Sequence, residues 1–350
     1  MALSTQRSRR LRELISQGVV ELPGAFNALS ARMIESEGFE AVYLSGAVLA
    51  NSVGGVPDVG LMTLSEARDH AAHVARATTI PIIMDADTGY GGPENAARTV
   101  GELEAVGVSG IHLEDQEFPK RCGHLEGKRL VSQQEFCEKI AAASAAKSCP
   151  DFLLIARTDA RGVVGYDEAV RRAHAYLEAG ADAIFPEALE SREEFVRFAK
   201  DVDTILLANM TEFGKTPYLT AEEFSRMGYD LVIYPVTLQR LAMKAIQDAL
   251  HTLKTRHTQE SLLEQMQTRQ ELYDLLDYDP NRLGCLGTVR RPEPRALACA
   301  ISKAIRAVRI VAWSPDRFIP MEKSHESRSV QAGPGRRGRR QHRHLLRRSG

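Results

Sequence analysis

The sequence is poor in cysteine and lacks a long hydrophobic run. Its five cysteines are odd in number, are spread over 350 residues and include no Cys-x-x-Cys pair. This pattern argues against a disulfide framework or a structural zinc site, and it favours a reducing cytoplasm. No stretch of about 18 apolar residues occurs, so a membrane span is excluded. The basic N-terminus has no apolar signal core, and a mitochondrial presequence is only a minor alternative to a cytoplasmic location.

An excess of charge of one sign is also absent overall, but the charge is unevenly distributed. The formal net charge is −1, from 45 basic and 46 acidic residues. Seven arginines and no acid lie in residues 331–350, so residues 1–330 hold 38 basic against 46 acidic residues, a net charge of −8. Such an acidic body disfavours nucleic-acid binding. Binding of nucleic acid or an acidic partner through the arginine-rich end is the non-enzyme alternative, although that end has no aromatic residue for base stacking.

Short β-branched runs alternate with amphipathic helical patterns between about residues 19 and 255. Eight such repeats favour an α/β fold, the (β/α)8 or TIM barrel. A doubly wound open sheet competes with it, but the GxGxxG turn expected after the first strand of such a sheet is missing. The expected strands are Val19–Leu22, Ala41–Ser45, Ile80–Asp85, Gly110–Glu114, Phe152–Arg157, Ala183–Glu187, Thr204–Asn209 and Leu231–Tyr234, and helices are expected over Pro93–Val106, Tyr166–Ala179, Ala221–Met227 and Thr258–Asp277.

The C-terminal end differs in texture from the rest of the chain. We expect residues 1–290 to form a single barrel domain with C-terminal helices, and residues 291–350 to be an atypical, partly disordered tail rich in arginine. The abrupt change in composition suggests translation in a shifted reading frame, which would alter the terminal helix.

Six of the eight expected strands end in a polar or charged residue. Active sites of such barrels lie at the C-terminal ends of the strands, so one mouth would collect all of these side chains. They occur in Ser45-Gly46, Asp85-Ala86-Asp87, Glu114-Asp115, Arg157-Thr158-Asp159, Glu187 and Asn209.

Four carboxylates in this set predict a metal site. Asp85 and Asp87, with Asp58 and Glu114 nearby in the expected geometry, supply only hard oxygen ligands. That donor set favours Mg²⁺, or Mn²⁺, over zinc, and it leaves coordination positions for water or substrate. The alternative is a simple turn built on Asp-Thr-Gly.

Cys122 lies in the segment Lys120-Arg121-Cys122-Gly123-His124. Two cations and a histidine beside a thiol lower its pKa, which makes Cys122 a candidate proton donor or nucleophile, on a loop that could close over the site. The alternative is an incidental loop cysteine whose basic neighbours are solvated. Arg157, Arg240 and Arg269 are candidates for binding substrate carboxylates. For Arg240 and Arg269 the alternative, which the sequence alone favours, is an ordinary arginine on a helix surface. His112 lies within a strand, and we interpret it as a core histidine rather than a ligand.

Taken together, these segments resemble the isocitrate lyase and phosphoenolpyruvate mutase superfamily. Within it the chain resembles the 2-methylisocitrate lyases, because it is short and lacks the segment inserted in isocitrate lyases. The resemblance covers roughly residues 5–280. It is carried by Tyr43-Leu44-Ser45-Gly46-Ala47, Asp85-Ala86-Asp87-Thr88-Gly89-Tyr90-Gly91, His112-Leu113-Glu114-Asp115-Gln116, Lys120-Arg121-Cys122-Gly123-His124, Asn209-Met210-Thr211-Glu212-Phe213-Gly214 and Met266-Gln267-Thr268-Arg269-Gln270-Glu271-Leu272-Tyr273.

The resemblance implies a barrel whose last helix is exchanged between the subunits of a homotetramer. It also implies retro-Claisen cleavage of a tricarboxylate, 2-methylisocitrate, to pyruvate and succinate in the methylcitrate cycle of propionate catabolism. Asp85 and Asp87 would hold Mg²⁺, with Asp58 and Glu114 acting through water, and Cys122 would be the general acid. Tyr43 and Glu187 are both candidates for the base. The implied substrate contacts are Ser45, Gly46, Ala47, Gly123, Arg157, Glu187, Asn209, Met210, Thr211, Arg240 and Arg269.

Ala47 departs from the superfamily pattern, which often has a glycine at that position. The added methyl group is expected to leave the backbone N–H contact intact. An isocitrate lyase or another phosphoenolpyruvate mutase-like activity, on phosphonopyruvate or oxaloacetate, is the alternative within the superfamily. Cys122 and its basic neighbours argue against the phosphonopyruvate and oxaloacetate activities, whereas isocitrate differs from 2-methylisocitrate by one methyl group, worth only ~1–3 kcal/mol in an apolar pocket.

Overall fold

The computed structural model describes residues 3–123 and 125–279. All of them belong to the first of two compact units in the chain, residues 1–291. The predicted tail of residues 291–350 and the frameshift hypothesis fall outside the described residues.

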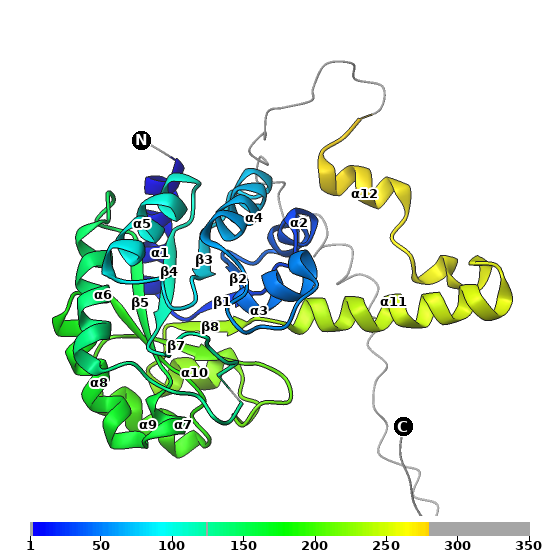
Figure 1. Ribbon diagram of the computed structural model, residues 1–350. Helices are drawn as coiled ribbons and strands as arrows, with labels where there is room; N and C mark the ends of the chain where they lie inside the picture. Colours follow the sequence, from blue (N-terminus) through cyan, green and yellow to red (C-terminus); the bar gives the residue numbers. More distant parts are fainter. Residues whose placement is uncertain (1–2, 124, 280–350) are drawn as a thin grey trace, which may run out of the picture. The chain divides into compact units, whose positions relative to one another are not determined.

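Eight parallel strands form the centre of the first unit (Figure 1). They follow the order β1-β8-β7-β6-β5-β4-β3-β2, so β8 returns to pair with β1. Gly24, just after β1, pairs with Tyr43 of β2, and the N–H of Ala25 donates to the Tyr43 carbonyl at 2.9 Å. This pairing brings the sheet to near closure and confirms the predicted barrel. The strands are β1 (Val20–Pro23), β2 (Val42–Leu44), β3 (Ile82–Asp85), β4 (Gly110–Glu114), β5 (Leu153–Thr158), β6 (Ala183–Pro186), β7 (Ile205–Asn209) and β8 (Leu231–Tyr234).

Helices connect the strands, and several begin where the sequence supplies a cap. The side-chain oxygens of Thr63, Ser132, Ser191 and Thr220 each accept an N–H from three residues further on. The helices up to β8 are α1 (Leu3–Gln17), α2 (Ala28–Ser36), α3 (Gly46–Leu49), the π-helix η1 (Ala50–Gly54), α4 (Leu64–Ala77), α5 (Pro93–Ala105), α6 (Gln133–Ala145), α7 (Ala160–Val163), α8 (Tyr166–Glu178), α9 (Arg192–Asp201) and α10 (Ala221–Met227).

The inside of the barrel is filled, and α1 closes its N-terminal end. Leu11 of α1 is fully buried and belongs to the same apolar cluster as Ile83 and Leu153, which point inward from β3 and β5. The Arg7 guanidinium donates to the carbonyl oxygens of Ala75, at 2.8 Å, in the last turn of α4, and of Gly107, at 3.3 Å, in the loop after α5. A functional site therefore has to lie at the opposite end, where the strands finish.

Three further helical segments follow β8, namely α11 (Thr237–Arg256), the 3₁₀-helix η2 (Glu260–Gln265) and α12 (Arg269–Leu276). The single helix predicted over Thr258–Asp277 is therefore wrong. Met266 adopts an extended backbone, and Thr268 with Glu271 forms a capping box that starts a new helix. No residue of α11 is buried. None of the described helices has the length and apolar character needed to cross a membrane.

Candidate active site

The C-terminal ends of the strands surround a cavity of about 1190 Å³. Ser45 follows β2, Asp85 ends β3, Arg157 lies near the end of β5, and Glu187 follows β6. The polar strand ends found in the sequence thus meet at one mouth, as predicted. The predicted site residues that line the cavity are Tyr43, Ser45, Ala47, Asp58, Asp85, Cys122, Gly123, Arg157, Glu187, Asn209, Thr211 and Arg240.

Five predicted site residues do not line the cavity. The N–H of Gly46 donates to Asp85 Oδ2 at 3.1 Å, which places Gly46 against the metal-type carboxylates. Asp87 and Glu114 are buried beside Asp85, and the buried Met210 accepts the N–H of Leu219 on its sulfur at 3.4 Å. Arg269 is exposed at the start of α12 and does not reach the cavity of its own chain.

Lys120 lies among the acidic side chains, although we had linked it to the thiol of Cys122. Its buried ammonium is 2.8 Å from Asp87 Oδ1 and also forms an ion pair with Asp58. Burial raises the pKa of Asp87 to about 6, with a further contribution from the neighbouring Asp85. Burial also raises the pKa of Glu114 well above its usual range, despite the nearby Arg157. Burial thus outweighs the nearby cations and disfavours the charged forms of Asp87 and Glu114.

The carboxylates fit a divalent cation that keeps several water or substrate ligands. Both carboxylate oxygens of Glu114 are buried without a hydrogen bond, although Arg157 Nη1 lies 3.2 Å from one of them. Among the described residues, no three acidic, imidazole or thiol side chains converge closely enough to enclose a metal. Mg²⁺ is commonly bound through only one or two carboxylates, with oxygen ligands from water and substrate completing its shell. The oxygen-only donor set of Asp85 and Asp87 matches that pattern.

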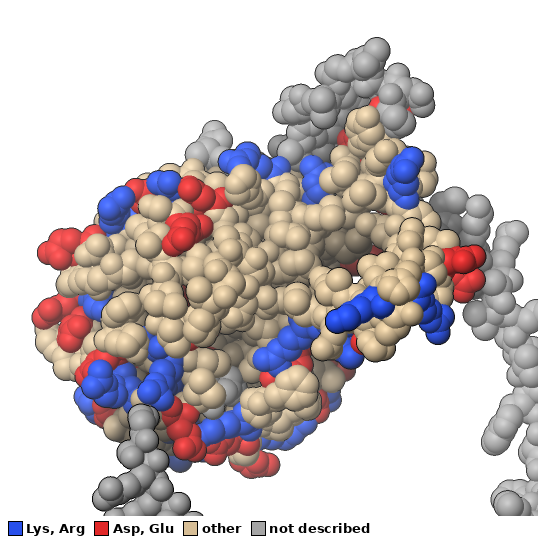
Figure 2. All heavy atoms as spheres, turned by 45° about the vertical axis from the view of Figure 1, so that its right-hand side comes forward, with Lys and Arg blue, Asp and Glu red and all other residues tan. Residues whose placement is uncertain are grey.

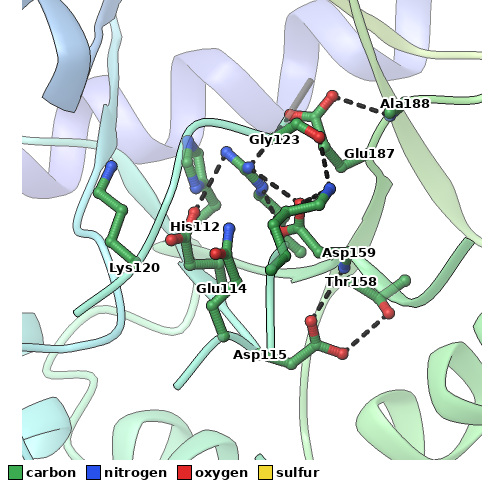
Figure 3. A network of polar contacts seen from close by, with 12 residues as sticks. His112, Glu114, Asp115, Lys120, Gly123, Thr158, Asp159, Glu187 and Ala188 are labelled. Carbon is green, nitrogen blue, oxygen red and sulfur yellow. Dashed lines mark hydrogen bonds and ion pairs between the residues drawn. The ribbon is translucent and has the colours of Figure 1, made fainter. Parts of the chain in front are cut away.

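Arg157 is held by three carboxylates, those of Glu114, Asp159 and Glu187, which are labelled in Figure 3. Its guanidinium contacts Glu114 at 3.2 Å, Asp159 at 3.0 Å and Glu187 at 3.3 Å, and its side chain is only 8% exposed. These contacts fix the orientation of the guanidinium before any ligand arrives. Asn209 adds a second link, because its amide nitrogen lies 3.4 Å from Glu187.

Cys122 is half-buried and faces the same cavity. Its neighbour Gly123 packs tightly against the charged pair: a Cβ added to Gly123 would lie 2.5 Å from both Arg157 Nη2 and Glu187 Cγ. The sequence predicts that Lys120 and Arg121 both act on the Cys122 thiol, but the structure pairs each of them with another group. Lys120 is engaged by carboxylates, and the exposed Arg121 donates to the Glu126 carbonyl at 3.2 Å. His124 lies outside the described residues.

Tyr43 and His112 form a buried pair behind the carboxylates. The Tyr43 hydroxyl and His112 Nε2 are 2.7 Å apart, and His112 Nδ1 lies 3.7 Å from Asp85 Oδ1. Burial lowers the pKa of His112 to about 4, so its ring is neutral near pH 7. Burial and Asp85 raise the pKa of Tyr43 well above its usual range. His112 is a core histidine, as we interpreted it, which also orients the Tyr43 hydroxyl.

Glu212 is a site residue that the sequence reasoning missed. It lines the cavity mouth, accepts a hydrogen bond from Thr237 on one carboxylate oxygen, and accepts the Arg240 guanidinium on its backbone carbonyl at 2.8 Å. It thereby ties the loop after β7 to the first turn of α11. The signal for it in the sequence was its place in the segment 209–214, three residues after the polar end of β7.

Replacing Gly46 with alanine is expected to weaken Mg²⁺ binding by about 10- to 100-fold, as seen when groups that orient metal ligands are changed. The added Cβ would lie 2.8 Å from Asp85 Oδ2 and 3.1 Å from Asp87 Oδ1, so both carboxylates must move. Calorimetric titration with MgCl₂ measures the effect. Gly101→Ala in α5 is the matched control, because a Cβ there meets no atom within 4 Å. An unchanged affinity in Gly46→Ala would contradict the proposed metal position.

Comparison with known proteins places the chain in one superfamily. The family model described as phosphoenolpyruvate phosphomutase matches residues 11–254. A probable 2-methylisocitrate lyase of Corynebacterium glutamicum is 52% identical over 267 residues, covering 76% of this chain and 87% of that protein. The 2-methylisocitrate lyase of Aeropyrum pernix is 50% identical over 269 residues, covering 77% and 86%.

Solved structures agree with this placement. A 2,3-dimethylmalate lyase, described as a member of the PEP mutase/isocitrate lyase superfamily, superposes with a TM-score of 0.73 at 37% identity, covering 79% of this chain and 92% of that one. Phosphonopyruvate hydrolase in complex with oxalate and Mg²⁺ gives a TM-score of 0.70 at 30% identity, covering 77% and 95%. The fold, the strand-end site and these likenesses agree, and the chain belongs to the phosphoenolpyruvate mutase/isocitrate lyase superfamily.

Proposed function

We propose that the chain is a carbon–carbon lyase that cleaves 2-methylisocitrate to pyruvate and succinate, a step of propionate catabolism. The observation that carries the proposal is the meeting of Cys122 with Arg157, Glu187 and Asp85 around one cavity. An acid, a carboxylate base, an anion-binding guanidinium and a metal-type carboxylate are the groups that this cleavage requires. The names of the relatives described above support the choice of substrate.

Glu187 is the group that we assign as the base. Its carboxylate is paired with Arg157 at 3.3 Å, whereas the raised pKa of Tyr43 keeps that phenol protonated. Glu187 takes the proton of the substrate hydroxyl, and the oxygen's electron pair forms the carbonyl of pyruvate as the carbon–carbon bond breaks. The electron pair of that bond moves onto the carbon of the future succinate, and the Cys122 thiol donates a proton to that carbon.

Negative charge develops on the succinate fragment as the bond breaks. Arg157 and, at the cavity mouth, Arg240 are placed to offset charge on substrate carboxylates. Asp85 and Asp87 would hold Mg²⁺, with Asp58 and Glu114 acting through water. When bound, the cation supplies Lewis-acid stabilisation of negative charge on substrate oxygens.

The test is a comparison of two substrates with the full chain. Pyruvate release from 2-methylisocitrate and glyoxylate release from isocitrate are measured side by side, with and without Mg²⁺. Faster, metal-dependent pyruvate release supports the proposal. Faster glyoxylate release would make the protein an isocitrate lyase instead, and cleavage of neither substrate would contradict the lyase assignment for this chain.

We also propose that the chain assembles as a homotetramer in which neighbouring subunits cover α11. Four of its apolar side chains follow a helical stripe and are 41–61% exposed, namely Met243, Ile246, Leu250 and Leu253. In Figure 2 the molecule is turned so that the side of Figure 1 that carries α11 comes forward. The middle of the face seen there is largely uncharged. In such an assembly a neighbour's α12 would supply Arg269, which is remote from the cavity of its own chain.

Placing aspartate at Ile246 and Leu250 together is expected to convert the tetramer into smaller species, because a charge in an apolar interface is unfavourable. Mass measurement by light scattering follows the change. The control carries aspartate at Gln247 and His251, which are exposed on the same helix outside the stripe. A tetramer that persists in the Ile246/Leu250 variant would rule out this face as the interface.

A further inference from the structure

The segment that carries Cys122 is fixed by polar contacts outside the cavity. On its N-terminal side, the Gln116 side chain accepts the N–H of Arg121 at 2.9 Å and donates to the Arg121 carbonyl at 2.8 Å. On its C-terminal side stands Lys128, which the mechanism does not use. The ammonium of Lys128 donates to the carbonyl oxygen of Gly123, the residue that follows Cys122.

Lys128 is buried together with a single carboxylate partner. Its side chain is 3% exposed, and its ammonium lies 2.7 Å from Oδ1 of Asp159, which is fully buried. A lysine taken out of water is unfavourable unless its charge is paired and its hydrogens find acceptors. The Gly123 carbonyl is thus one of two acceptors that keep this ammonium in place.

Asp159 is held in turn by the barrel wall. Its N–H donates to Asp115 Oδ1 at 2.9 Å, and Asp115 Oδ2 accepts the hydroxyls of Thr158 at 2.9 Å and of Tyr176, on α8, at 2.8 Å. Figure 3 shows Asp115, Thr158 and Asp159 below Glu187. A continuous buried chain of contacts therefore runs from α8 through Asp115, Asp159 and Lys128 to Gly123.

Gly123 has little freedom to move without disturbing the reacting groups. A Cβ on it would collide with Arg157 and Glu187, so there is no room for a larger residue beside that pair. We propose that Lys128 is a positioning residue: held by Asp159, its ammonium fixes the Gly123 carbonyl and thereby sets where the adjacent Cys122 thiol meets the substrate carbon. This inference rests on the proposed role of Cys122 as the acid.

The test combines kinetics with the chemical reactivity of Cys122. In Lys128→Met the ammonium is lost at nearly constant side-chain length, and kcat is expected to fall at least about tenfold while KM changes less than about threefold, since misplacement of a reacting group by about 1 Å lowers rates by about 10²-fold. The iodoacetamide alkylation rate of Cys122, divided by that of Cys137 in the same molecules, is expected to change as well. Cys137 lies on α6 and gives an internal reference.

Lys147→Met is the matched control. Lys147 is also an ion-paired lysine, 2.9 Å from Asp182 before β6, at the barrel end opposite the cavity. Its loss is expected to lower the thermal midpoint without moving kcat or the alkylation ratio. Lys128→Arg keeps the charge but not the geometry, and its kcat is expected to lie between those of Lys128→Met and the unmodified chain.

A lower thermal midpoint in Lys128→Met with unchanged kcat and an unchanged alkylation ratio would make Lys128 merely structural and overturn the proposal. If Lys128→Met does not fold, Lys128→Arg provides the test. A kcat and an alkylation ratio equal to those of the unmodified chain would overturn the proposal, and a change in both would support it. The alkylation ratio needs no substrate. A chain that cleaves neither substrate therefore refutes the proposed function while the positioning of Cys122 is still measured.

Discussion

Cys122→Ala is expected to lower kcat for cleavage of 2-methylisocitrate by about 10²- to 10⁴-fold, the usual contribution of a positioned proton donor. The carbon–carbon bond can break without the thiol, but the carbanion then waits for a proton from water or returns to substrate. Cys122 lines the cavity next to a glycine packed on Arg157 and Glu187, which is the position that the proposed proton donor needs. Pyruvate release coupled to lactate dehydrogenase measures the loss.

Cys137→Ala is the control for removing a half-buried thiol elsewhere. Its sulfur donates to the Ala175 carbonyl at 3.6 Å, away from the cavity, and activity near that of the unmodified chain is expected. Calorimetric binding of 2-methylisocitrate to Cys122→Ala in the presence of Mg²⁺ separates chemistry from binding. Cleavage within threefold of the unmodified chain would remove Cys122 from the role of acid.

Asp85→Asn is expected to lower cleavage by about three orders of magnitude, since Lewis-acid stabilisation of developing charge contributes several kcal/mol. Asp85 organises the carboxylate cluster, because it accepts the N–H of Gly46 at 3.1 Å and that of Asp87 at 3.0 Å. The amide has nearly the same size but loses the charge that attracts a cation, and its single carbonyl oxygen can accept only one of these two N–H groups. Treatment with EDTA should produce a similar loss in the unmodified chain, and added Mg²⁺ or Mn²⁺ should reverse it.

Asp69→Asn, an exposed substitution on α4, controls for the removal of one carboxylate from the surface. Its rate and its response to Mg²⁺ are expected to match those of the unmodified chain. If EDTA-treated protein retained full activity, or if Asp85→Asn cleaved at the unmodified rate, the metal site would be placed wrongly.

The strand ends could be predicted from the sequence because they combine two local signals. A buried apolar run followed at once by a polar residue marks both the strand and its exit, as at Asp85 and Glu187, and parallel topology then brings these ends together. The relationships that could not be predicted depend on residues far apart in the chain. Lys120 meets Asp58 across 62 positions, and Lys128 meets Asp159 across 31.

The apolar pattern also gave a wrong prediction where it continued from one helix, η2, into the next, α12. The apolar spacing over 258–277 suits a single helix, but a capping box depends on the conformation at Thr268 and starts a second one. The guanidinium chemistry and the resemblance both predict Arg269 as a substrate contact, but among the described residues it does not line the cavity of its own chain.

The plug formed by α1 has a consequence for turnover. With Leu11 and its neighbours filling the bottom of the barrel, both cleavage products must leave through the same opening. We expect the fragment seated deeper to leave after the outer one, so that release follows a fixed sequence. The last product to leave occupies the empty enzyme and competes with substrate, whereas the first one inhibits by a mixed pattern. The helix that closes one end of the barrel thus bears on the order of product release as well as on the packing of the core.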